Sequence, residues 1–514
     1  MNGAESLVRT LSAGGIDVCF ANPGTSEMQL VAAIDRAPDM RCVLGLFEGV
    51  VTGAADGYAR MASKPACTLL HLGPGLANGL ANLHNASRAN VPLVNIVGQH
   101  ATYHLVHDAP LTSDIETLAR PNSKWLRTSY LPSTLGRDIA EAIVAARTEP
   151  GQIATLIVPA DVAWAEGGVV GEIHPVPLAP LPSSAMIERA VAMLRAGLPT
   201  AILLAGSALH GKGLVRAGRI AAATGAKLLA PYNFARIERG ADRPVVERIP
   251  YVPDQAVELL KGFRQLILVG AQVPVAYFAH PNRNSVLTSA DCEIFVLAKL
   301  GEDCGGTLDA LAVDLSAETK EPLVEKAERP VQPTGPMTLA GLAATVAAVL
   351  PEGAIVVDES MTSGRGMMAA ARGAAPHDWL ACTGGSIGIA MPLAVGAAVA
   401  CPDRRVLCLT ADGSGMYTLQ ALWTMAREGL KVTTVVFANR AYAVLKNEFA
   451  SLGVGAAGPS ASAMFDIGRP DLDWIALAEG MGVPGVRVTS LDGFVRELRK
   501  GLEHEGPTLI EVVL

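Results

Sequence analysis

The chain has 514 residues, of which half are apolar and only 4% aromatic, and its formal net charge is −8. This length exceeds one hydrophobic core and predicts about three domains. The acidic balance without a basic cluster argues against nucleic acid as a partner. The longest apolar run, residues 387–401, is shorter than the roughly 20 residues that a membrane-spanning helix needs, so no membrane partner is expected.

The cysteine pattern and the N-terminus both bear on location. The eight cysteines form no CxxC pair, and most of them lie in apolar runs. The first residues lack the basic start and apolar core of a signal peptide. We therefore expect reduced core cysteines in a cytoplasmic protein.

Two proline-rich stretches, 174–182 and 329–336, divide the chain. Such stretches favour exposed linkers, and they separate a first block (1–172), a central block (183–327) and a third block (337–514). In each block, strand-like segments alternate with helix-like segments, which is typical of parallel sheets. The sequence therefore predicts an α/β fold with three doubly wound parallel-sheet domains. The expected strands are 17–21, 41–46, 66–71, 93–97, 200–205, 227–230, 265–269, 354–358, 406–410, 433–438 and 508–513.

Three residues at strand or helix ends of the first block are candidates for chemistry. His71 ends a strand next to a Gly-Pro-Gly turn, which suits an acid/base group but also a structural histidine. Thr25, in a loop after a strand, is a further candidate or a helix N-cap. Glu48 stands at a helix start, either as a protonation switch or as a carboxylate favoured by the helix dipole.

The third block carries the most informative pattern. The apolar runs 406–410 and 432–438 lead directly to Asp412 and Asn439. Ligands of open α/β sheets sit at the carboxyl ends of the strands, and oxygen ligands of this kind suit Mg²⁺ together with phosphate oxygens. Gly413 would let a diphosphate approach the backbone, and the helix start after it would favour the anion. The alternative is a tight turn in an ordinary sheet.

A glycine-rich segment, 384–388, precedes the apolar helix of the third block. Gly385 could bring a backbone carbonyl against a ligand, and Ile387 could wedge against the same ligand. Alone, this segment identifies no function.

Taken together, these stretches resemble the thiamine-diphosphate (ThDP) enzymes of the pyruvate oxidase, acetolactate synthase and benzoylformate decarboxylase group. The resemblance spans the whole chain, in the order pyrimidine-binding domain, central domain and diphosphate-binding domain. The metal motif of this family is GDG followed by NN. Here Ala411 and Ala438 replace its first positions, neither of which supplies a metal-binding side chain. The resemblance implies ThDP and Mg²⁺ as cofactors, with Asp412, Asn439 and the backbone carbonyl of Ala441 as metal ligands.

The resemblance also assigns roles around the cofactor. It implies that Glu48 hydrogen-bonds N1′ of the aminopyrimidine, that the Gly385 carbonyl holds the 4′-nitrogen, and that Ile387 forces the cofactor into a V shape. Since Glu48 and the diphosphate site come from different chains in this family, it implies a homodimer or homotetramer with active sites at the chain interface. The residues that it implies near the diphosphate are Gly413, Ser414, Tyr442, Thr362 and Ser363.

At two positions of the substrate side the chain resembles benzoylformate decarboxylase more than the synthases, whereas residues 73–75, 97–99 and 108–110 resemble the synthases. That enzyme has a hydroxyl residue at the position of Thr25 and a histidine at that of His71. His280 falls near its second histidine, although the alignment slips by about one residue, and a surface histidine is the alternative. The implied function is non-oxidative decarboxylation of a small-molecule 2-oxo acid, with carboligation as a further step. The alternatives are acetolactate synthase, which converts two pyruvates to acetolactate and CO₂, and a non-catalytic binding or regulatory protein on this fold.

Overall fold

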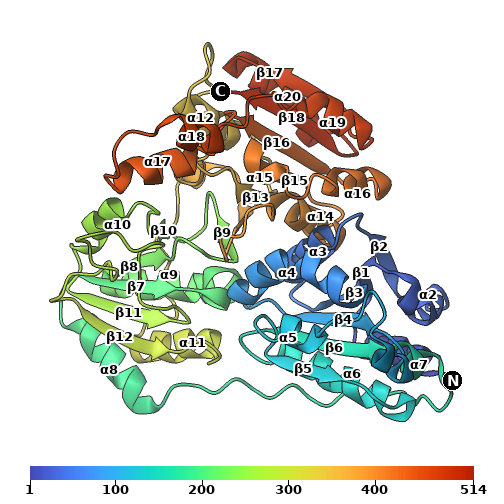
Figure 1. Ribbon diagram of the computed structural model, residues 1–514. Coiled ribbons are helices and arrows are strands. Elements are labelled where there is room, and N and C mark those ends of the chain that lie inside the picture. Colours follow the sequence, from blue (N-terminus) through green and yellow to red (C-terminus); the bar gives the residue numbers. More distant parts are fainter.

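The computed structural model describes residues 1–514 and contains three sheets, each flanked by helices (Figure 1). The third block lies above the other two in this view, with the central block at the lower left and the first block at the lower right. Nearly all strand pairs are parallel, so the prediction of an α/β fold with three parallel-sheet domains is confirmed.

The first block forms a six-stranded parallel sheet in the order β2-β1-β3-β4-β6-β5. Its inner strands are buried along their whole length, as expected for parallel strands covered on both faces. The strands are β1 (Val18–Asn22), β2 (Arg41–Leu44), β3 (Ala66–Leu70), β4 (Leu93–Gln99), β5 (Trp125–Thr128) and β6 (Ile153–Pro159). The helices are α1 (Gly3–Ala13), η1 (Thr25–Glu27), α2 (Met28–Asp35), α3 (Glu48–Ala62), α4 (Leu72–Ala89), η2 (Thr102–His107), α5 (Ile115–Ala119), α6 (Pro132–Arg147) and α7 (Ala160–Trp164).

The central block forms a five-stranded parallel sheet in the order β10-β8-β7-β11-β12. Its strands are β7 (Thr200–Leu204), β8 (Lys227–Ala230), β10 (Glu247–Arg248), β11 (Gln265–Val269) and β12 (Glu293–Ala298). Its helices are α8 (Ser184–Arg195), η3 (Gly206–Leu209), α9 (Gly211–Thr224), α10 (Pro253–Leu260) and α11 (Cys304–Asp314).

The third block forms the core of a seven-stranded sheet in the order β17-β18-β16-β15-β13-β14-β9. Its own strands are β13 (Ile355–Glu359), β14 (His377–Ala381), β15 (Val406–Ala411), β16 (Val432–Ala438), β17 (Gly485–Val488) and β18 (Thr508–Val513). Its helices are α12 (Leu339–Val349), α13 (Met367–Ala370), η4 (Ala371–Gly373), α14 (Ala390–Ala400), α15 (Asp412–Gly415), α16 (Ala421–Arg427), α17 (Ala443–Ser451), α18 (Pro459–Phe465), α19 (Trp474–Gly480) and α20 (Leu491–Glu503).

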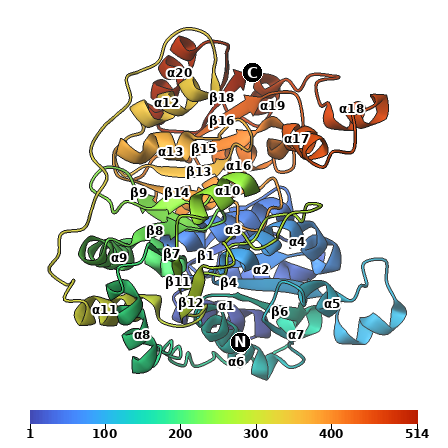
Figure 2. The same ribbon diagram turned by 90° about the vertical axis from the view of Figure 1, so that its left-hand side faces the viewer.

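Both proline-rich stretches are extended connections. The first runs from α7 to α8 along the lower edge of the molecule (Figure 1). The second lies between α11 and α12 and climbs along the outside from the central to the third block (Figure 2). Their composition therefore predicted their conformation correctly.

Helix α14 joins the third block to the first. Every residue of this helix except Ala400 is buried, because it packs tightly against α3. A Cβ on Gly396 would lie 1.8 Å from the Ala54 carbonyl oxygen, and one on Gly57 would lie 2.1 Å from that of Leu393. Only glycine permits this approach, so the two blocks share one hydrophobic core. None of the helices is long and apolar enough to span a membrane.

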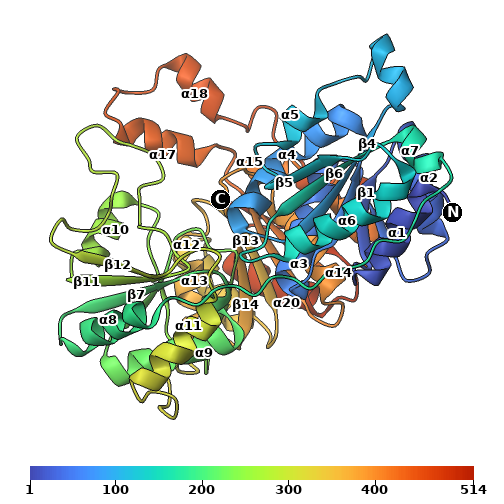
Figure 3. The ribbon, with the colours of Figure 1, turned by 90° about the horizontal axis from the view of Figure 1, so that it is seen from below.

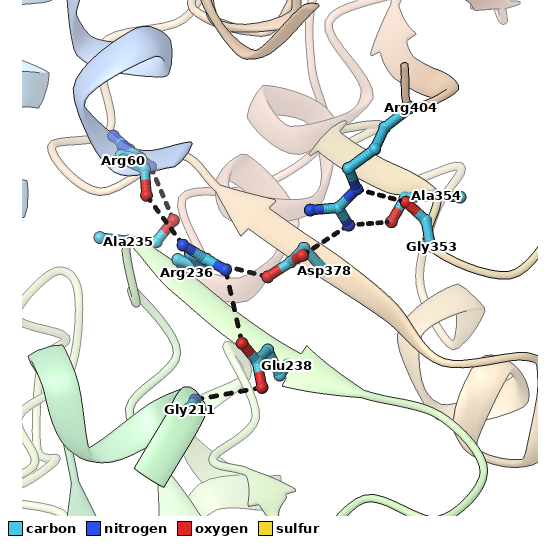
Figure 4. A network of polar contacts seen from close by, with 9 residues as sticks. All are labelled: Arg60, Gly211, Ala235, Arg236, Glu238, Gly353, Ala354, Asp378 and Arg404. Atoms are coloured by element: carbon cyan, nitrogen blue, oxygen red, sulfur yellow. Dashed lines mark hydrogen bonds and ion pairs between the residues drawn. The ribbon is translucent and has the colours of Figure 1, made fainter. Parts of the chain in front are cut away.

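A polar cluster ties all three blocks together (Figure 4). Strand β9 (Arg236–Arg239) leaves the central block and pairs antiparallel with β14. Arg60 of α3 forms a buried ion pair with Asp56 and donates to the carbonyls of Ala235 and Ala381. Arg236 in turn bonds Asp378 of β14. The central block thus supplies one strand of the third sheet, which the sequence did not predict.

Candidate functional site

Asp412 and Asn439 meet at one edge of the third sheet. Strands β15 and β16 are paired in parallel, so the residues that follow them are neighbours. The Asp412 carboxylate accepts the backbone N–H of Arg440 at 2.6 Å, directly after Asn439. The side-chain oxygen of Asn439 accepts the N–H of Ala441 at 3.0 Å. The carboxylate and the carboxamide therefore lie together, as strand adjacency predicts.

The surroundings of Asp412 suit a hard cation. Burial raises the pKa of Asp412, while the backbone N–H groups of Arg440 and Gly413 lower it. No cluster of three His, Cys, Asp or Glu side chains is arranged to hold a metal. A cation here would instead take oxygen ligands from one carboxylate, one amide and backbone carbonyls, which is the chemistry that Mg²⁺ prefers. The carbonyl of Ala441 is available for this purpose, because it accepts no hydrogen bond.

Gly413 lies in close contact with an aromatic ring. A Cβ at this position would lie 2.5 Å from the ring of Tyr442, so no side chain fits. The helix that begins at Asp412, α15, has only four residues. A helix this short has little dipole, and the N–H of Gly413 already donates to the Asp412 carboxylate, so helix α15 contributes less to anion binding than expected.

A cavity of about 930 Å³ opens over these residues. It extends between α10 of the central block and α17 of the third, which lie on the same side of the molecule (Figure 3). Its size is that of a cofactor or substrate pocket. The predicted site residues that line it are Thr362, Gly385, Ile387, Asp412, Gly413, Ser414, Asn439, Ala441 and Tyr442. Ser363 is buried and does not line it.

The central block supplies a wall of this cavity that the sequence did not reveal. The ring centroids of Tyr232 and Tyr277 lie 5.2 and 5.5 Å from that of Tyr251. The Arg248 guanidinium stacks 4.0 Å from the Tyr232 ring centroid. Arg239 is also in the lining, and burial lowers its pKa to about 10. Isolated tyrosines and arginines carry no motif, so only the fold identifies this wall.

The segment with Gly385 and Ile387 also lines the cavity and contacts the tyrosine wall. Gly385 has φ +79°, and Gly388 has φ +93°, which are left-handed conformations suited to glycine. A Cβ on Gly385 would lie 2.1 Å from the hydroxyl of Tyr277. The glycine predicted from the sequence is therefore required by both backbone conformation and space.

Glu48 lies outside this cavity. It is the first residue of α3, is 8% exposed, and accepts a hydrogen bond from Asn78 at 3.0 Å. Gly75 lies close to it, since a Cβ there would be 3.1 Å from Glu48 Oε1. A single chain therefore presents the Asp412 side and the Glu48 side as separate sites.

His71 is paired with a carboxylate that the sequence did not reveal as a candidate. Its Nδ1 lies 2.8 Å from Glu27 Oε2, which also accepts the N–H of Gly24 at 2.7 Å. Glu27 is fully buried, and burial raises its pKa, although Gly24 and His71 counteract this. The other oxygen, Oε1, has no partner. The dyad thus combines a titratable ring with a carboxylate that retains a free acceptor.

The backbone around His71 is constrained. A Cβ on Gly24 would lie 2.2 Å from the His71 ring, so the loop after β1 packs directly on the imidazole. Leu72 has φ +51°, a strained conformation for a leucine. Such strain concentrates at functional sites. Thr25 is exposed at the start of η1.

His280 is not a surface residue. Its side chain is 8% exposed, and its Nε2 lies 3.6 Å from the carboxylate of Glu448. Glu448 lines the cavity and also accepts a long hydrogen bond from the Tyr251 hydroxyl at 3.5 Å. His280 itself is not in the lining, and its Nδ1 has no partner. It therefore lies behind the cavity wall.

Comparisons with known proteins decide the family. Residues 1–118 match the thiamine pyrophosphate enzyme, N-terminal TPP binding domain, and residues 363–512 match its C-terminal TPP binding domain. A Mycobacterium tuberculosis protein, provisionally named acetolactate synthase large subunit IlvX, is 51% identical over 100% of this chain and 99% of its own length. The chain belongs to the thiamine-diphosphate-dependent enzymes.

Two further relatives of this ThDP enzyme carry decarboxylase names. Benzoylformate decarboxylase of Pseudomonas aeruginosa is 28% identical, over 97% of this chain and 96% of that protein. The structure of the ThDP-dependent 4-hydroxybenzoylformate decarboxylase of Rhodococcus jostii RHA1 superposes with a TM-score of 0.85 at 25% identity. It covers 99% of this chain and 98% of that one. The relatives therefore include both decarboxylases and acetolactate synthases.

The ThDP enzyme chain by itself gathers only part of the predicted site. The residues predicted for the diphosphate and metal, except Ser363, line one cavity, whereas Glu48, His71, Thr25 and His280 do not line it. Glu27 was missed, although one signal pointed to it. Strands β1 and β3 are parallel neighbours, with Asn22 opposite Leu70. The residues after both strands must therefore share one edge.

Proposed function

We propose that this chain is a cytoplasmic ThDP- and Mg²⁺-dependent enzyme that decarboxylates a 2-oxo acid without oxidation. The observation that carries the proposal is the pairing of His71 with the buried Glu27, in the same block as Glu48. Decarboxylation to an aldehyde requires a proton to be delivered to the carbon that loses CO₂. A histidine oriented by a carboxylate is suited to deliver it.

The cavity fits the cofactor half that the third block would hold. Asp412, Asn439 and the Ala441 carbonyl would hold Mg²⁺, since their oxygens lie together and the Ala441 carbonyl is unused. Gly413 and Ser414 would lie against the diphosphate. The other residues proposed for this half are Tyr442, Thr362 and Ser363. Bound ThDP would supply an electron sink for the electron pair left when CO₂ departs.

The rest of the site is assigned to backbone and carboxylate groups. The Gly385 carbonyl and the Ile387 side chain would contact the aminopyrimidine, and Glu48 would hold the proton at its N1′. Because Glu48 does not line the cavity of its own chain, we propose a homodimer or homotetramer in which the partner supplies it. His71, with Thr25 beside it, would face the substrate, and His280 would support the opposite wall through Glu448.

Acetolactate synthase is the second candidate, because the 51% identical relative bears that provisional name. Both reactions begin with loss of CO₂ from a 2-oxo acid. They differ in whether a proton or a second pyruvate then reacts at the same carbon. The products therefore separate the two candidates.

The test is a substrate survey with product analysis. Protein loaded with ThDP and Mg²⁺ would receive pyruvate, benzoylformate or a branched 2-oxo acid, with CO₂ release and products followed by NMR. We expect CO₂ and an aldehyde, and a His71→Ala control should retain cofactor binding but lose most turnover. Acetolactate from pyruvate would favour the synthase. No CO₂ from any 2-oxo acid, with folded protein that binds ThDP, would refute decarboxylation.

A further inference from the structure

The segment that presents Gly385 and Ile387 has no backbone support of its own. Between β14 and α14, residues 383–388 take part in no backbone-to-backbone hydrogen bond. Two of these residues are glycines with positive φ. A segment of this composition has many accessible conformations. Side chains from elsewhere must therefore select the one observed.

Asn85 of α4 supports the segment from the first block. Its amide N–H donates to the carbonyl of Ser386 at 2.8 Å, and its amide oxygen accepts the N–H of Ser386 at 3.2 Å. Asn85 thus pairs with one residue in both directions, as a neighbouring strand would. It is fully buried, and Thr383 also donates its hydroxyl to the Asn85 carbonyl at 2.6 Å.

Asn85 belongs to a row of asparagines along α4. Asn78 donates to the carboxylate of Glu48 at 3.0 Å, and Asn82 donates to the carbonyl of Gly49 at 2.7 Å. Asn85 donates to Asn82 at 3.0 Å. The spacing of these residues, i, i+4 and i+7, places them on one helical face. One face of α4 therefore contacts both the Glu48 region and the Ser386 region.

Glu359 supports the same segment from the third block. At the end of β13, its carboxylate accepts the backbone N–H of Gly388 at 3.0 Å, of Ile389 at 3.4 Å and of Ala390 at 3.1 Å. It is 3% exposed and lines the cavity. Thr418 adds a hydroxyl donated to the Gly388 carbonyl at 2.7 Å. These contacts fix the segment at the start of α14.

The two supports stand on either side of Ile387. Asn85 holds the residue before it, and Glu359 holds the residue after it. We propose that Asn85 and Glu359 are positioning residues that fix the Gly385 carbonyl and the Ile387 side chain in the cavity before the cofactor binds. The proposal rests on the proposed roles of Gly385 and Ile387 toward ThDP.

The energetic reason is preorganisation. If the segment were free, ordering it would oppose cofactor binding, because each ordered residue loses conformational entropy. Because hydrogen bonds within the protein already order the segment, this entropy is lost when the protein folds and not when the cofactor binds. Removing Asn85 should therefore weaken ThDP binding even though Asn85 is remote from the Asp412 site.

The experiment compares Asn85→Ala with Asn95→Ala. Asn95 is also a fully buried asparagine of the first block, but it bonds Thr68 at 2.7 Å and Thr155 at 3.0 Å within the sheet. Asn85→Ala loses the side-chain hydrogen bonds to Ser386, Asn82 and Cys382, and Asn95→Ala loses those to Thr68 and Thr155, so a general loss of stability affects both variants. Hydrogen–deuterium exchange of peptides covering residues 383–390 is measured in the cofactor-free protein. The Kd of ThDP is measured by calorimetry at saturating Mg²⁺.

We expect Asn85→Ala to speed exchange in 383–390 and to raise the Kd of ThDP, each by about tenfold or more, with neither change in Asn95→Ala. Exchange equal in the two variants would overturn the proposal. Faster exchange with an unchanged Kd would also overturn it, since the segment would then not serve the cofactor. If Asn85→Ala does not fold, Glu359→Gln tests the other support. It should speed exchange at residues 388–390, and unchanged exchange there would overturn the proposal.

The proposed function can fail separately. If the wild-type protein binds ThDP but releases no CO₂ from any 2-oxo acid, the proposed decarboxylase function is refuted. In that case the exchange and Kd comparison still decides whether Asn85 positions the segment. The two failures therefore give different results.

Discussion

The surroundings of Glu359 predict how strongly this residue makes the free energy of unfolding depend on pH. Complete burial is the largest influence on this carboxyl and raises its pKa from 4.5 to about 7, while the N–H groups of Ala390, Ile389 and Gly388 act in the opposite direction. The folded protein thus holds the proton more tightly than the unfolded chain does. Stability from this group is fully present below about pH 4.5 and is lost as the pH rises through about 7.

Glu359→Gln removes this proton linkage while keeping the side-chain volume. One pKa unit corresponds to about 1.4 kcal/mol, so the shift amounts to about 3 kcal/mol. We expect the variant's free energy of unfolding, relative to the wild type, to rise by about 3 kcal/mol between pH 4.5 and pH 7.5. Above pH 7.5 the difference should become constant. The increase reflects a charge that the wild type must keep buried.

Urea unfolding of the cofactor-free proteins would measure this difference. Trp379 and Trp474 are fully buried in the third block, so tryptophan fluorescence reports its unfolding. Thr418→Val is the matched control, because it removes a hydrogen bond to Gly388 without removing a titratable group. A difference between Glu359→Gln and wild type that is as independent of pH as that of the control would refute the reasoning.

Three further predictions concern other parts of the molecule. Arg60→Met leaves Asp56 buried without its partner and should lower the free energy of unfolding by about 3–5 kcal/mol. Substituting both residues should restore part of this lost free energy, and urea unfolding would measure both effects. Asp412→Asn should weaken Mg²⁺-dependent ThDP binding, as measured by calorimetry, and removing Mg²⁺ with EDTA should weaken ThDP binding by the wild type to the same level. If the variant and the wild type bind ThDP equally well with Mg²⁺ present, the metal assignment is contradicted. His71→Ala should lower kcat by about 10²–10⁴-fold, and Glu27→Gln by about tenfold, with little change in KM; wild-type kcat in either variant would exclude the dyad.

The sequence predicted that Asp412 and Asn439 are neighbours, because the signals there are local. The run before Asp412 and the run before Asn439 are each uninterrupted and apolar, as fully buried parallel strands require. Their adjacency then follows from the order of the strands. Gly413 could also be predicted from the sequence, because a close approach of another group to the backbone at this position excludes every residue with a side chain.

The contacts that the sequence did not reveal join segments far apart in the chain. Strand β14 begins with the polar residues His377 and Asp378, so its sequence lacks the apolar pattern expected of a fully buried strand. Asp378 is tolerated there because Arg236 of the central block and Arg404 bond it. Neither partner is near it in sequence, so no local pattern could predict the strand. The pairing of β9 with β14 could not be predicted for the same reason.

The two buried glutamates of this enzyme differ in what remains for them to bind. Glu359 has backbone N–H donors on both of its oxygens, so fixed groups occupy both acceptors and its contribution is positional. Glu27 has one oxygen occupied by Gly24 and His71, while the other has no partner. A buried acceptor left unsatisfied raises the free energy of the folded state. The contact between Glu27 Oε2 and His71 Nδ1 instead orients the imidazole, and a fixed orientation is what a group that exchanges protons with a substrate requires.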